Sequence, residues 1–282
     1  MTTLEWPIAL STGCFYRRPI VDILPAVRAA GFDQIEVCSF PAHLDYHDTA
    51  AVESAAHRLR EVGIDPVSFH APFAHHIDIT SPDAAVREPS VAELQRACDA
   101  AARLGCKHVV LHPGPEKEGR PQEAEFVQRM HHAAESLNRV AGHCCQLGIS
   151  LLLENMLAHL QFGHVRDMMY LLGEIDTCEV GACLDTGHAH LAGEMGMVIH
   201  KLAGHLRMVH VNDNNGHRDE HLAPGDGSID WPWVIRELHR AHFHGVLVLE
   251  LHGGEDEPEQ TTLARAVRAR EFIQKSAREA AS

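Results

Sequence analysis

The chain alternates between amphipathic stretches typical of helices and short apolar runs typical of buried strands. One motif recurs: a helix-like segment, a Gly, and then an apolar run, as in RAAGFDQIEVC, REVGIDPVSFH, ARLGCKHVVLH, CQLGISLLLEN and HFHGVLVLELH. A Gly directly after a helix suits the left-handed position that ends it. The glycines concerned are Gly31, Gly63, Gly105, Gly148 and Gly245. The apolar runs are nearly continuous, as in parallel strands covered on both faces.

Extended along the chain, the pattern predicts eight strands, at residues 8–14, 33–38, 65–70, 107–112, 149–154, 180–185, 206–211 and 246–251. Helix-like stretches between them include 19–30, 50–62, 83–104, 122–147, 164–173, 231–243 and 259–278. Alternating β and α units without a linker favour the α/β class and a single (β/α)8 TIM barrel over residues 1–282, with the tail REAAS frayed. A doubly wound open sheet is the alternative, although the turn TGCFYRR lacks the G-x-G-x-x-G of dinucleotide folds.

Composition narrows the classes of partner. The formal charge of −15 argues against a broadly cationic surface for nucleic acid or anionic membranes, although it does not exclude a local basic groove. None of the eight cysteines lies in a C-x-x-C pair, which excludes zinc ribbons and thioredoxin-like sites. The N-terminal residues lack a secretory pattern, and no apolar run is long enough to span a membrane. We therefore expect a cytoplasmic protein without a membrane partner, and leave open whether it forms a homo-oligomer.

Polar side chains mark the ends of the predicted strands, where TIM barrels carry their active sites. Strands two to eight end near Glu36, His70, His112, Glu154, Asp185, His210 and Glu250. Taken singly, each is more often structural: a lone His is usually hydrogen-bonded in place, and a lone Asp can cap a turn. Taken together at one barrel mouth, these groups would repel one another or stay unsatisfied without a cation. The pattern therefore predicts a metal site.

Further ligand-type residues follow two of these strands. In CLDTGHAH, His188 comes three residues after Asp185, so both can face one side of a tight turn. In NDNNGHRDEHLAPGDGSIDW, Asp219 and His221 are two residues apart, which places both on one face of an extended segment. The candidate ligands are thus His70, His112, Glu154, Asp185, His188, His210, Asp219, His221 and Glu250, enough for one to three divalent ions. Imidazole with carboxylate suits Zn²⁺, Mn²⁺, Fe²⁺ or Co²⁺; we expect Zn²⁺ or Mn²⁺.

Three other residues are candidates for contacts around the ligands. Glu36 and His252 are expected beside the metal ligands or in contact with substrate. Arg218 is a candidate for binding a substrate phosphate, although an Arg in a loop is more often solvated.

In chain order, the motifs SFHAPF, VVLHPG, LLLENM, CLDTGHAH, MVHVND, DEH and LVLELHG resemble the xylose isomerase-like TIM-barrel superfamily. This superfamily includes endonuclease IV-type AP endonucleases and many sugar or sugar-phosphate isomerases and epimerases. Likeness to the endonucleases implies three zinc ions. His70 and His112 would bind the first ion, with Glu154 bridging it to the second. Asp185, His210 and Glu250 would complete the second ion, and the third would be bound by His188, Asp219 and His221.

Likeness to the isomerase branch implies a different occupancy. There, the equivalents of Glu154, Asp185, His210 and Glu250 hold a single divalent ion, and the equivalent of His188 contacts substrate in some members. The opening LSTGCFYRR departs from the Gly-Ala-His-Val-Ser type of start found in the endonucleases. The sequence also has no cluster of interleaved basic and aromatic residues for reading DNA.

We therefore expect a metal-dependent isomerase or epimerase of a sugar or sugar phosphate, in which Glu154 and Glu250 move a proton through an enediolate. The alternative is an endonuclease IV-like multinuclear zinc phosphoesterase acting on abasic DNA; only this alternative involves nucleic acid. A non-catalytic carbohydrate-binding barrel is the third hypothesis.

Overall fold

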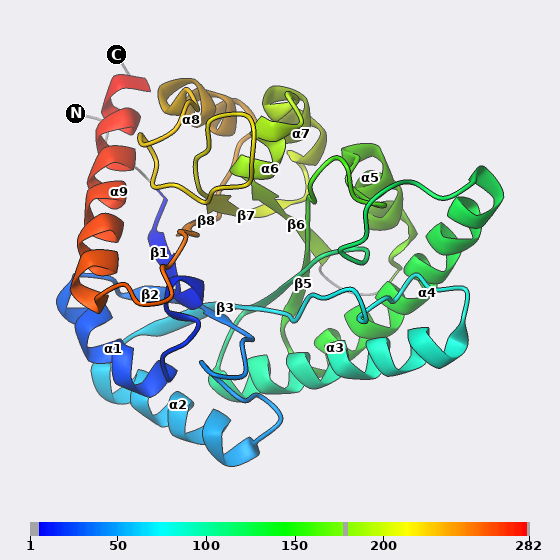
Figure 1. Cartoon of the computed structure of the whole chain (residues 1–282), viewed down its shortest axis with the longest axis horizontal. Helices are drawn as coiled ribbons and strands as arrows, with labels where there is room; N and C mark the ends of the chain where they lie inside the picture. The colour runs from blue at the N-terminus through cyan, green and yellow to red at the C-terminus, as the bar shows by residue number, and fades with distance from the viewer. Residues whose placement is uncertain (1–5, 177–179, 281–282) are drawn as a thin grey trace.

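Eight parallel strands close into a barrel in chain order, which confirms the predicted TIM barrel. The structure is a computed structural model that describes residues 6–176 and 180–280. Helices surround the strands (Figure 1). The strands are β1 (Ile8–Ser11), β2 (Gln34–Cys38), β3 (Asp65–His70), β4 (His108–Leu111), β5 (Ser150–Glu154), β6 (Val180–Asp185), β7 (Leu206–Val211) and β8 (Val246–Leu249).

The helices of the outer layer follow the amphipathic stretches of the sequence. They are α1 (Ile20–Ala29), α2 (Thr49–Val62), α3 (Ala84–Leu104), α4 (Glu123–Leu147), α5 (Val165–Glu174), α6 (Thr186–Leu191), α7 (Met195–Leu202), α8 (Trp231–Arg240) and α9 (Glu259–Ala280), with a short 3-10 helix at Thr12–Phe15. Asp48 and Asp83 cap α2 and α3 by accepting hydrogen bonds from the backbone of Ala50 and Ala85. Among the described residues, no helix has the length and apolar character needed to cross a membrane.

The barrel interior is apolar away from the mouth and polar toward it. Val67, Val110, Leu152, Met208 and others form a small buried cluster inside the strands, separate from the larger core between strands and helices. On β2, Ile35 pairs with Pro66 but Glu36 pairs with Ser68, so the register shifts by one residue at Val67. Such bulges often redirect a side chain near a functional site. Here Glu36 and Ser68 form a hydrogen bond inside the barrel.

Several predicted boundaries were wrong. The first strand ends at Ser11, because Thr12–Phe15 turns into a 3-10 helix. The predicted strand 33–38 does end at Cys38, but Glu36, which was expected near its end, lies within β2. Helices α6 and α7 were not predicted: α6 is only six residues long and rich in His and Gly, whereas α7 does carry a helical pattern of buried residues, Met195, Val198, Ile199 and Leu202, that the prediction missed.

The C-terminal helices also differ from the prediction. Helix α8 ends at Arg240, three residues early, and α9 continues through Ala280, so residues 278–280 of the tail expected to be frayed are helical. Residues 281 and 282 lie outside the described chain. Four of the five motif glycines have positive φ, whereas Gly245 does not. An added Cβ at Gly245 would lie 1.9 Å from the carbonyl oxygen of Arg207, so this Gly is needed for close backbone approach.

Candidate metal centre

The structure brings all nine candidate ligands together at the C-terminal mouth of the barrel. They come from the ends of six strands, from α6, and from the loop between β7 and α8. Within each group of ligands, one atom of every member lies within 4.8 Å of the others. The four overlapping groups are His70–His112–Glu154, His70–His210–Glu250, Glu154–Asp185–His210–Glu250 and His188–Asp219–His221.

The group Glu154–Asp185–His210–Glu250, called the inner group here, centres on His210, which is fully buried on β7. Its Nδ1 lies 3.3 Å from Oε1 of Glu154 and 3.4 Å from Oε2 of Glu250. Asp185 both caps α6, by accepting from the backbone N–H of His188 at 2.7 Å, and accepts from the side-chain amide of Asn212 at 2.6 Å. The capping role considered for Asp185 is therefore present, and it fixes this carboxylate beside the other ligands.

Glu36 lies on the opposite side of the His210 ring from the other two glutamates. Nε2 of His210 donates to Oε2 of Glu36 at 3.1 Å, and the hydroxyls of Ser11 and Ser68 also donate to this carboxylate. Because Glu36 accepts a hydrogen bond from Nε2–H, Nδ1 is left to face Glu154 and Glu250. This placement supports a role in orienting His210; Glu36 itself is fully buried.

The second group joins β3, β4 and β5. Nδ1 of His70 donates to the carbonyl oxygen of Ala71 at 2.9 Å, which directs Nε2 to Oε2 of Glu154 at 3.2 Å. Nε2 of His112 lies 3.5 Å from the same carboxylate oxygen. One oxygen of Glu154 thus faces this group and the other faces His210, which is the arrangement of a bridging carboxylate.

The outer group joins α6 to the loop after β7. Nδ1 of His188 donates to the carbonyl oxygen of Asn155 at 2.8 Å, and Nδ1 of His221 lies 3.1 Å from the carbonyl oxygen of Glu250. Their Nε2 atoms lie 3.4 and 3.2 Å from Oδ2 of Asp219. His221 has a φ of 44°, an uncommon backbone conformation for a residue other than Gly. Anchoring one ring nitrogen so that the other faces a ligand site is typical of metal-binding histidines.

Burial and the neighbouring charges shift the pKa values of the site residues in different directions. Burial raises the pKa of Glu250, but the nearby His210 outweighs it, and the pKa falls to about 2. Burial raises the pKa of Asp185, to about 6 after partial compensation by His188. Burial lowers the pKa of His70, but contact with Glu154 outweighs it and raises the pKa to about 9. Positive charge is therefore strongly favoured between these carboxylates, whether on imidazole or on a bound cation.

The side chains fit a divalent ion. Within the described chain, Nδ1 of His112, Nδ1 of His210 and Oε2 of Glu250 are buried without a hydrogen-bond partner. Unsatisfied buried polar atoms are costly, and all three belong to the ligand groups. The mixture of imidazole nitrogen and carboxylate oxygen suits Zn²⁺ or Mn²⁺. The residues that could hold an ion are therefore present and oriented, while the choice of metal is not fixed by them.

The loop that carries Asp219 and His221 is built around Asp213. This buried carboxylate accepts hydrogen bonds from the backbone N–H groups of Asn214, Gly225 and Ile229 and from the indole of Trp231, all between 2.9 and 3.1 Å. Asp213 has the residue type of a ligand, but its oxygens are used to hold the loop. Its role was not predicted, because its partners lie up to 18 residues further along the chain.

A pocket of about 260 Å³ opens above the inner group. It is lined by His70, His221 and Glu250 and by the expected substrate contact His252. Arg218, expected to bind a substrate phosphate, does not line this pocket; its side chain is 83% exposed and lies 3.9 Å from Glu220. The structure thus places His252, but not Arg218, where a substrate could meet the ligands.

Three aromatic side chains form a wall of this pocket, and the sequence did not point to them. They are Tyr16, Phe40 and Phe73. The rings of Tyr16 and Phe40 lie 5.3 Å apart, and those of Phe40 and Phe73 lie 6.3 Å apart. Phe40 and Phe73 are each 39% exposed, although they are large and apolar. Partly exposed aromatic rings beside polar groups are typical of small-molecule sites.

The chain belongs to the xylose isomerase-like TIM-barrel family, whose model matches residues 24–275. It is similar to the probable endonuclease 4 of Mycobacterium leprae, with 31% identity over 220 residues, which cover 74% of this chain and 81% of the relative.

Two solved structures have folds that superpose on this chain. A D-tagatose 3-epimerase-like protein superposes with a TM-score of 0.82 at 22% identity, covering 97% of this chain and 98% of that chain; this likeness shows the shared fold. The TTHB071 protein from Thermus thermophilus, soaked with ZnCl2, superposes with a TM-score of 0.73 at 28% identity, covering 96% of this chain and 98% of that one. The similar proteins thus include a probable endonuclease by sequence and an epimerase-like protein by fold alone.

Proposed function

We propose that this protein is a metal-dependent isomerase or epimerase of an uncharged sugar. The observation that carries the proposal is the meeting of Glu154 and Glu250 in one ligand group, below a pocket with an aromatic wall. Glu154 is the last residue of β5 and Glu250 directly follows β8, and these two strands are not neighbours in the barrel. Two carboxylates that approach a bound molecule from different strands suit proton removal and return.

The lining of the pocket supports a small neutral substrate. Among the described residues that line it there is no Lys or Arg, and the imidazoles of His70 and His221 already face the carboxylates of Glu154 and Asp219, so no unpaired cation in the wall is available for a phosphate. Its volume of about 260 Å³ is below the range of about 300–1,000 Å³ usual for drug-sized ligands. Aromatic rings can pack against the C–H faces of a sugar, while His252 and the carboxylates can bind its hydroxyl groups. We therefore infer that the substrate is a sugar rather than a sugar phosphate.

Glu250 is the better placed of the two glutamates to act as the base. It lines the pocket, its side chain is 19% exposed, and its lowered pKa keeps it ionised. Glu250 would accept the proton from the carbon next to the sugar carbonyl, and the C–H electron pair would move toward the carbonyl oxygen. Isomerisation returns this proton to the neighbouring carbon while the hydroxyl proton moves to the former carbonyl oxygen. Epimerisation returns a proton to the same carbon from the opposite face, and Glu154 is the candidate for the group that would pass it on.

A divalent ion bound between Glu154, Asp185, His210 and Glu250 would polarise the substrate oxygens and make the carbon-bound proton more acidic. Glu36 would hold the His210 ring, and Asn212 would hold the Asp185 carboxylate. The aromatic wall would limit the access of water to the reacting carbons. His188, for which both metal binding and substrate contact were expected, lies in the outer group with Asp219.

Solvent-deuterium exchange tests this proposal. The manganese- or zinc-loaded protein would be incubated in D₂O with a panel of aldoses and ketoses, and deuterium at carbon would be followed by NMR. We expect exchange in the wild type and a fall of at least a hundredfold in Glu250→Gln. Undiminished exchange in both Glu154→Gln and Glu250→Gln would contradict the assignment. Glu220→Gln, in the neighbouring loop and outside the four ligand groups, is the matched control.

A second candidate function is phosphoester hydrolysis by a multinuclear zinc site. It is favoured by the outer group, since His188, Asp219 and His221 offer ligands beyond those that a single ion requires. The 31% identity to a probable endonuclease 4 also supports it. Clustered ions would supply a hydroxide nucleophile and bind phosphate oxygens.

Metal content and DNA incision separate the two candidates. Three zinc ions per chain, with incision of an abasic duplex that is lost in His221→Gln, would support hydrolysis. One tightly bound ion and no incision would support the isomerase proposal. His217→Gln is the matched control, because His217 is an exposed histidine of the same loop.

A further inference from the structure

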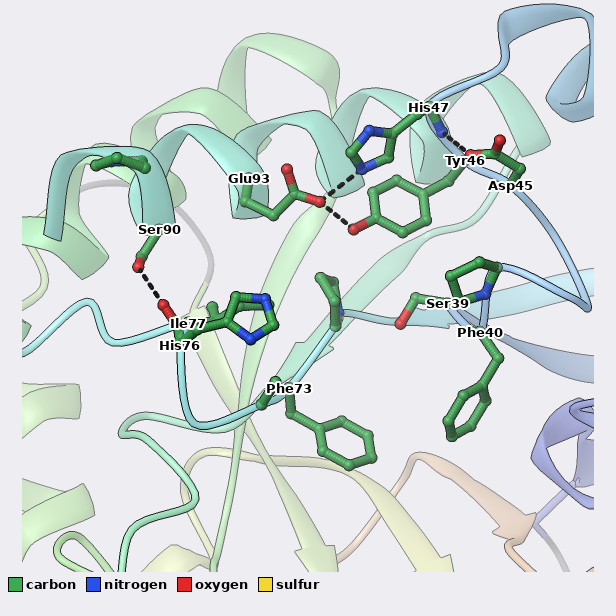
Figure 2. Close-up of a pocket in the computed structure, with 14 residues that line it drawn as sticks. Ser39, Phe40, Asp45, Tyr46, His47, Phe73, His76, Ile77, Ser90 and Glu93 are labelled. Atoms are coloured by element: carbon green, nitrogen blue, oxygen red, sulfur yellow. Dashed lines mark hydrogen bonds and ion pairs between the residues drawn. The ribbon is translucent and has the colours of Figure 1, made fainter. Parts of the chain in front are cut away.

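A larger pocket lies beside the metal centre, and the proposed reaction does not account for it. It has a volume of about 660 Å³ and is formed by the segments after β2 and β3 together with α3. Figure 2 shows Glu93 reaching from α3 toward Tyr46 and His47, with Phe40 and Phe73 on the side of the pocket away from it.

The two pockets share a wall. Phe40 and Phe73 line both this pocket and the smaller one above the ligands. Phe73 also stacks against His112, with ring centroids 5.0 Å apart. The two pockets are therefore adjacent and meet at these two partly exposed rings.

The polar groups of the larger pocket are arranged around Glu93. Oε1 of Glu93 accepts hydrogen bonds from the hydroxyl of Tyr46 and, at 2.6 Å, from Nε2 of His47. Oε2 accepts from Arg96 at 2.9 Å. Burial raises the pKa of Glu93, but the hydrogen bonds from Tyr46 and His47 outweigh it and the net shift is downward. This carboxylate is thus fixed and ionised, and its side chain is 21% exposed, so it can accept further hydrogen bonds.

The charge of the pocket selects against anions. Apart from two histidines, Asp45 and Glu93 are the charged residues among the described ones that line it, and none is Lys or Arg. A phosphate would meet two carboxylates without a permanent compensating cation. Hydroxyl groups, in contrast, can donate to the carboxylates while a ring packs against Phe40, Tyr46 and Phe73.

We propose that this pocket binds a second, uncharged sugar ring, so that the substrate is a disaccharide or other glycoside whose reacting ring lies over the metal ligands. The combined site, about 260 and 660 Å³, is too large for one monosaccharide to fill. The proposal rests on the proposed isomerase or epimerase function, and it names the substrate class of that same site.

The test compares reducing disaccharides with their reducing-end monosaccharide. Maltose, cellobiose and lactose would each be compared with D-glucose and D-glucose 6-phosphate in the deuterium-exchange assay with the metal-loaded full chain. We expect kcat/KM for at least one disaccharide to exceed that for D-glucose by tenfold or more. We also expect Glu93→Ala and Glu93→Gln to lose most of this gain while leaving the rate with D-glucose within twofold of wild type.

Controls keep the outcome interpretable. Glu88→Ala changes a carboxylate of the same helix that pairs with Arg139 and does not line the pocket, so it should keep the full gain. Tyr46→Phe is the second variant in case Glu93→Ala does not fold. It removes one hydrogen bond to Glu93 but keeps the aromatic ring. Melting temperatures of all variants would be measured in parallel.

The results separate failure of this inference from failure of the proposed function. Exchange with D-glucose but no gain for any disaccharide, or a gain that survives Glu93→Ala, would overturn the second pocket alone. A higher kcat/KM for D-glucose 6-phosphate than for every disaccharide would also overturn it. If no sugar takes up deuterium, the proposed function fails, and calorimetric binding of the disaccharides then decides this inference. Binding that is lost in Glu93→Ala would support it. No binding to the wild type would overturn it.

Discussion

Nε2 of His210 lies 3.1 Å from Oε2 of Glu36, inside the barrel and out of contact with solvent. This hydrogen bond fixes which nitrogen of His210 faces Glu154 and Glu250. Such contacts behind a ligand typically change metal affinity by about 10- to 100-fold when they are removed. The Glu36–His210 pair is thus a test of whether the inner group holds a metal.

We predict that Glu36→Gln weakens zinc or manganese binding to the inner group by about 10- to 100-fold. Gln keeps the size of the side chain, but it loses the negative charge that favours a proton on Nε2 of His210. Competition titration with a chromogenic chelator would measure the affinity. Glu61→Gln on the exposed surface of α2 should bind as wild type does, and an unchanged affinity in Glu36→Gln would contradict the orienting role.

Asp213→Asn should destabilise the loop that carries Asp219 and His221. An amide has one acceptor oxygen in place of two, so at least one buried donor among Gly225, Ile229 and Trp231 loses its partner, at a cost of about 1–3 kcal/mol. Calorimetry should show a lower melting temperature, and zinc binding at the outer group should weaken more than at the inner group. Asp226→Asn, at an exposed carboxylate of the same loop, is the control; equal effects of the two changes would refute the prediction.

His43 should make the protein sensitive to acid. Nδ1 of His43 donates to the carbonyl oxygen of Arg18 at 2.6 Å, and Nε2 accepts from Thr12 at 2.9 Å. Burial lowers the pKa of this imidazole to about 4 in the folded chain. Between about pH 6.5 and pH 4 the unfolded chain binds a proton that the folded chain does not, so the free energy of unfolding falls by up to about 3 kcal/mol as the pH drops.

Urea unfolding of wild type and His43→Gln, both with EDTA, would measure this effect. The variant should lose less stability than wild type between pH 7 and pH 4.5. The exposed His57→Gln should follow wild type. Parallel pH profiles for wild type and His43→Gln would show that His43 does not carry this sensitivity.

Metal binding should stabilise the fold. An ion at 100 times its dissociation constant adds about 2.7 kcal/mol if it binds only the folded chain. For a chain of this size that corresponds to a rise in melting temperature of roughly 5 °C. Differential scanning fluorimetry with EDTA and with added zinc would measure it, and Mg²⁺ at the same concentration is the control. No shift with Zn²⁺, Mn²⁺ or Co²⁺ would contradict a metal site in these ligand groups.

The order of elements could be predicted because buried parallel strands have a plain signature. Runs such as VVL and LLL are apolar on both faces, and this requirement is local. The ligands could be predicted for a related reason: a charged residue such as Glu154 at the end of such a run has no place in an apolar barrel interior.

What the sequence did not reveal depends on contacts between distant segments. Glu36 was expected at a strand end, but β2 continues to Cys38, and only the pairing with β3 turns Glu36 toward His210. Phe40 and Phe73 follow different strands, and nothing in their neighbours indicates that they meet. Asp213 has the residue type of a ligand, and only the fold of the following loop uses up its oxygens.

The ligands differ in what holds them. Those of the inner group are fixed by the register of the strands, whereas Asp219 and His221 are carried by a loop with its own internal support in Asp213. The candidate ligands carried by residues 212–230 can therefore change without a change in the barrel or in the inner ligands. The outer group alone depends on this loop, since the other candidate ligands lie on the strands or directly after them.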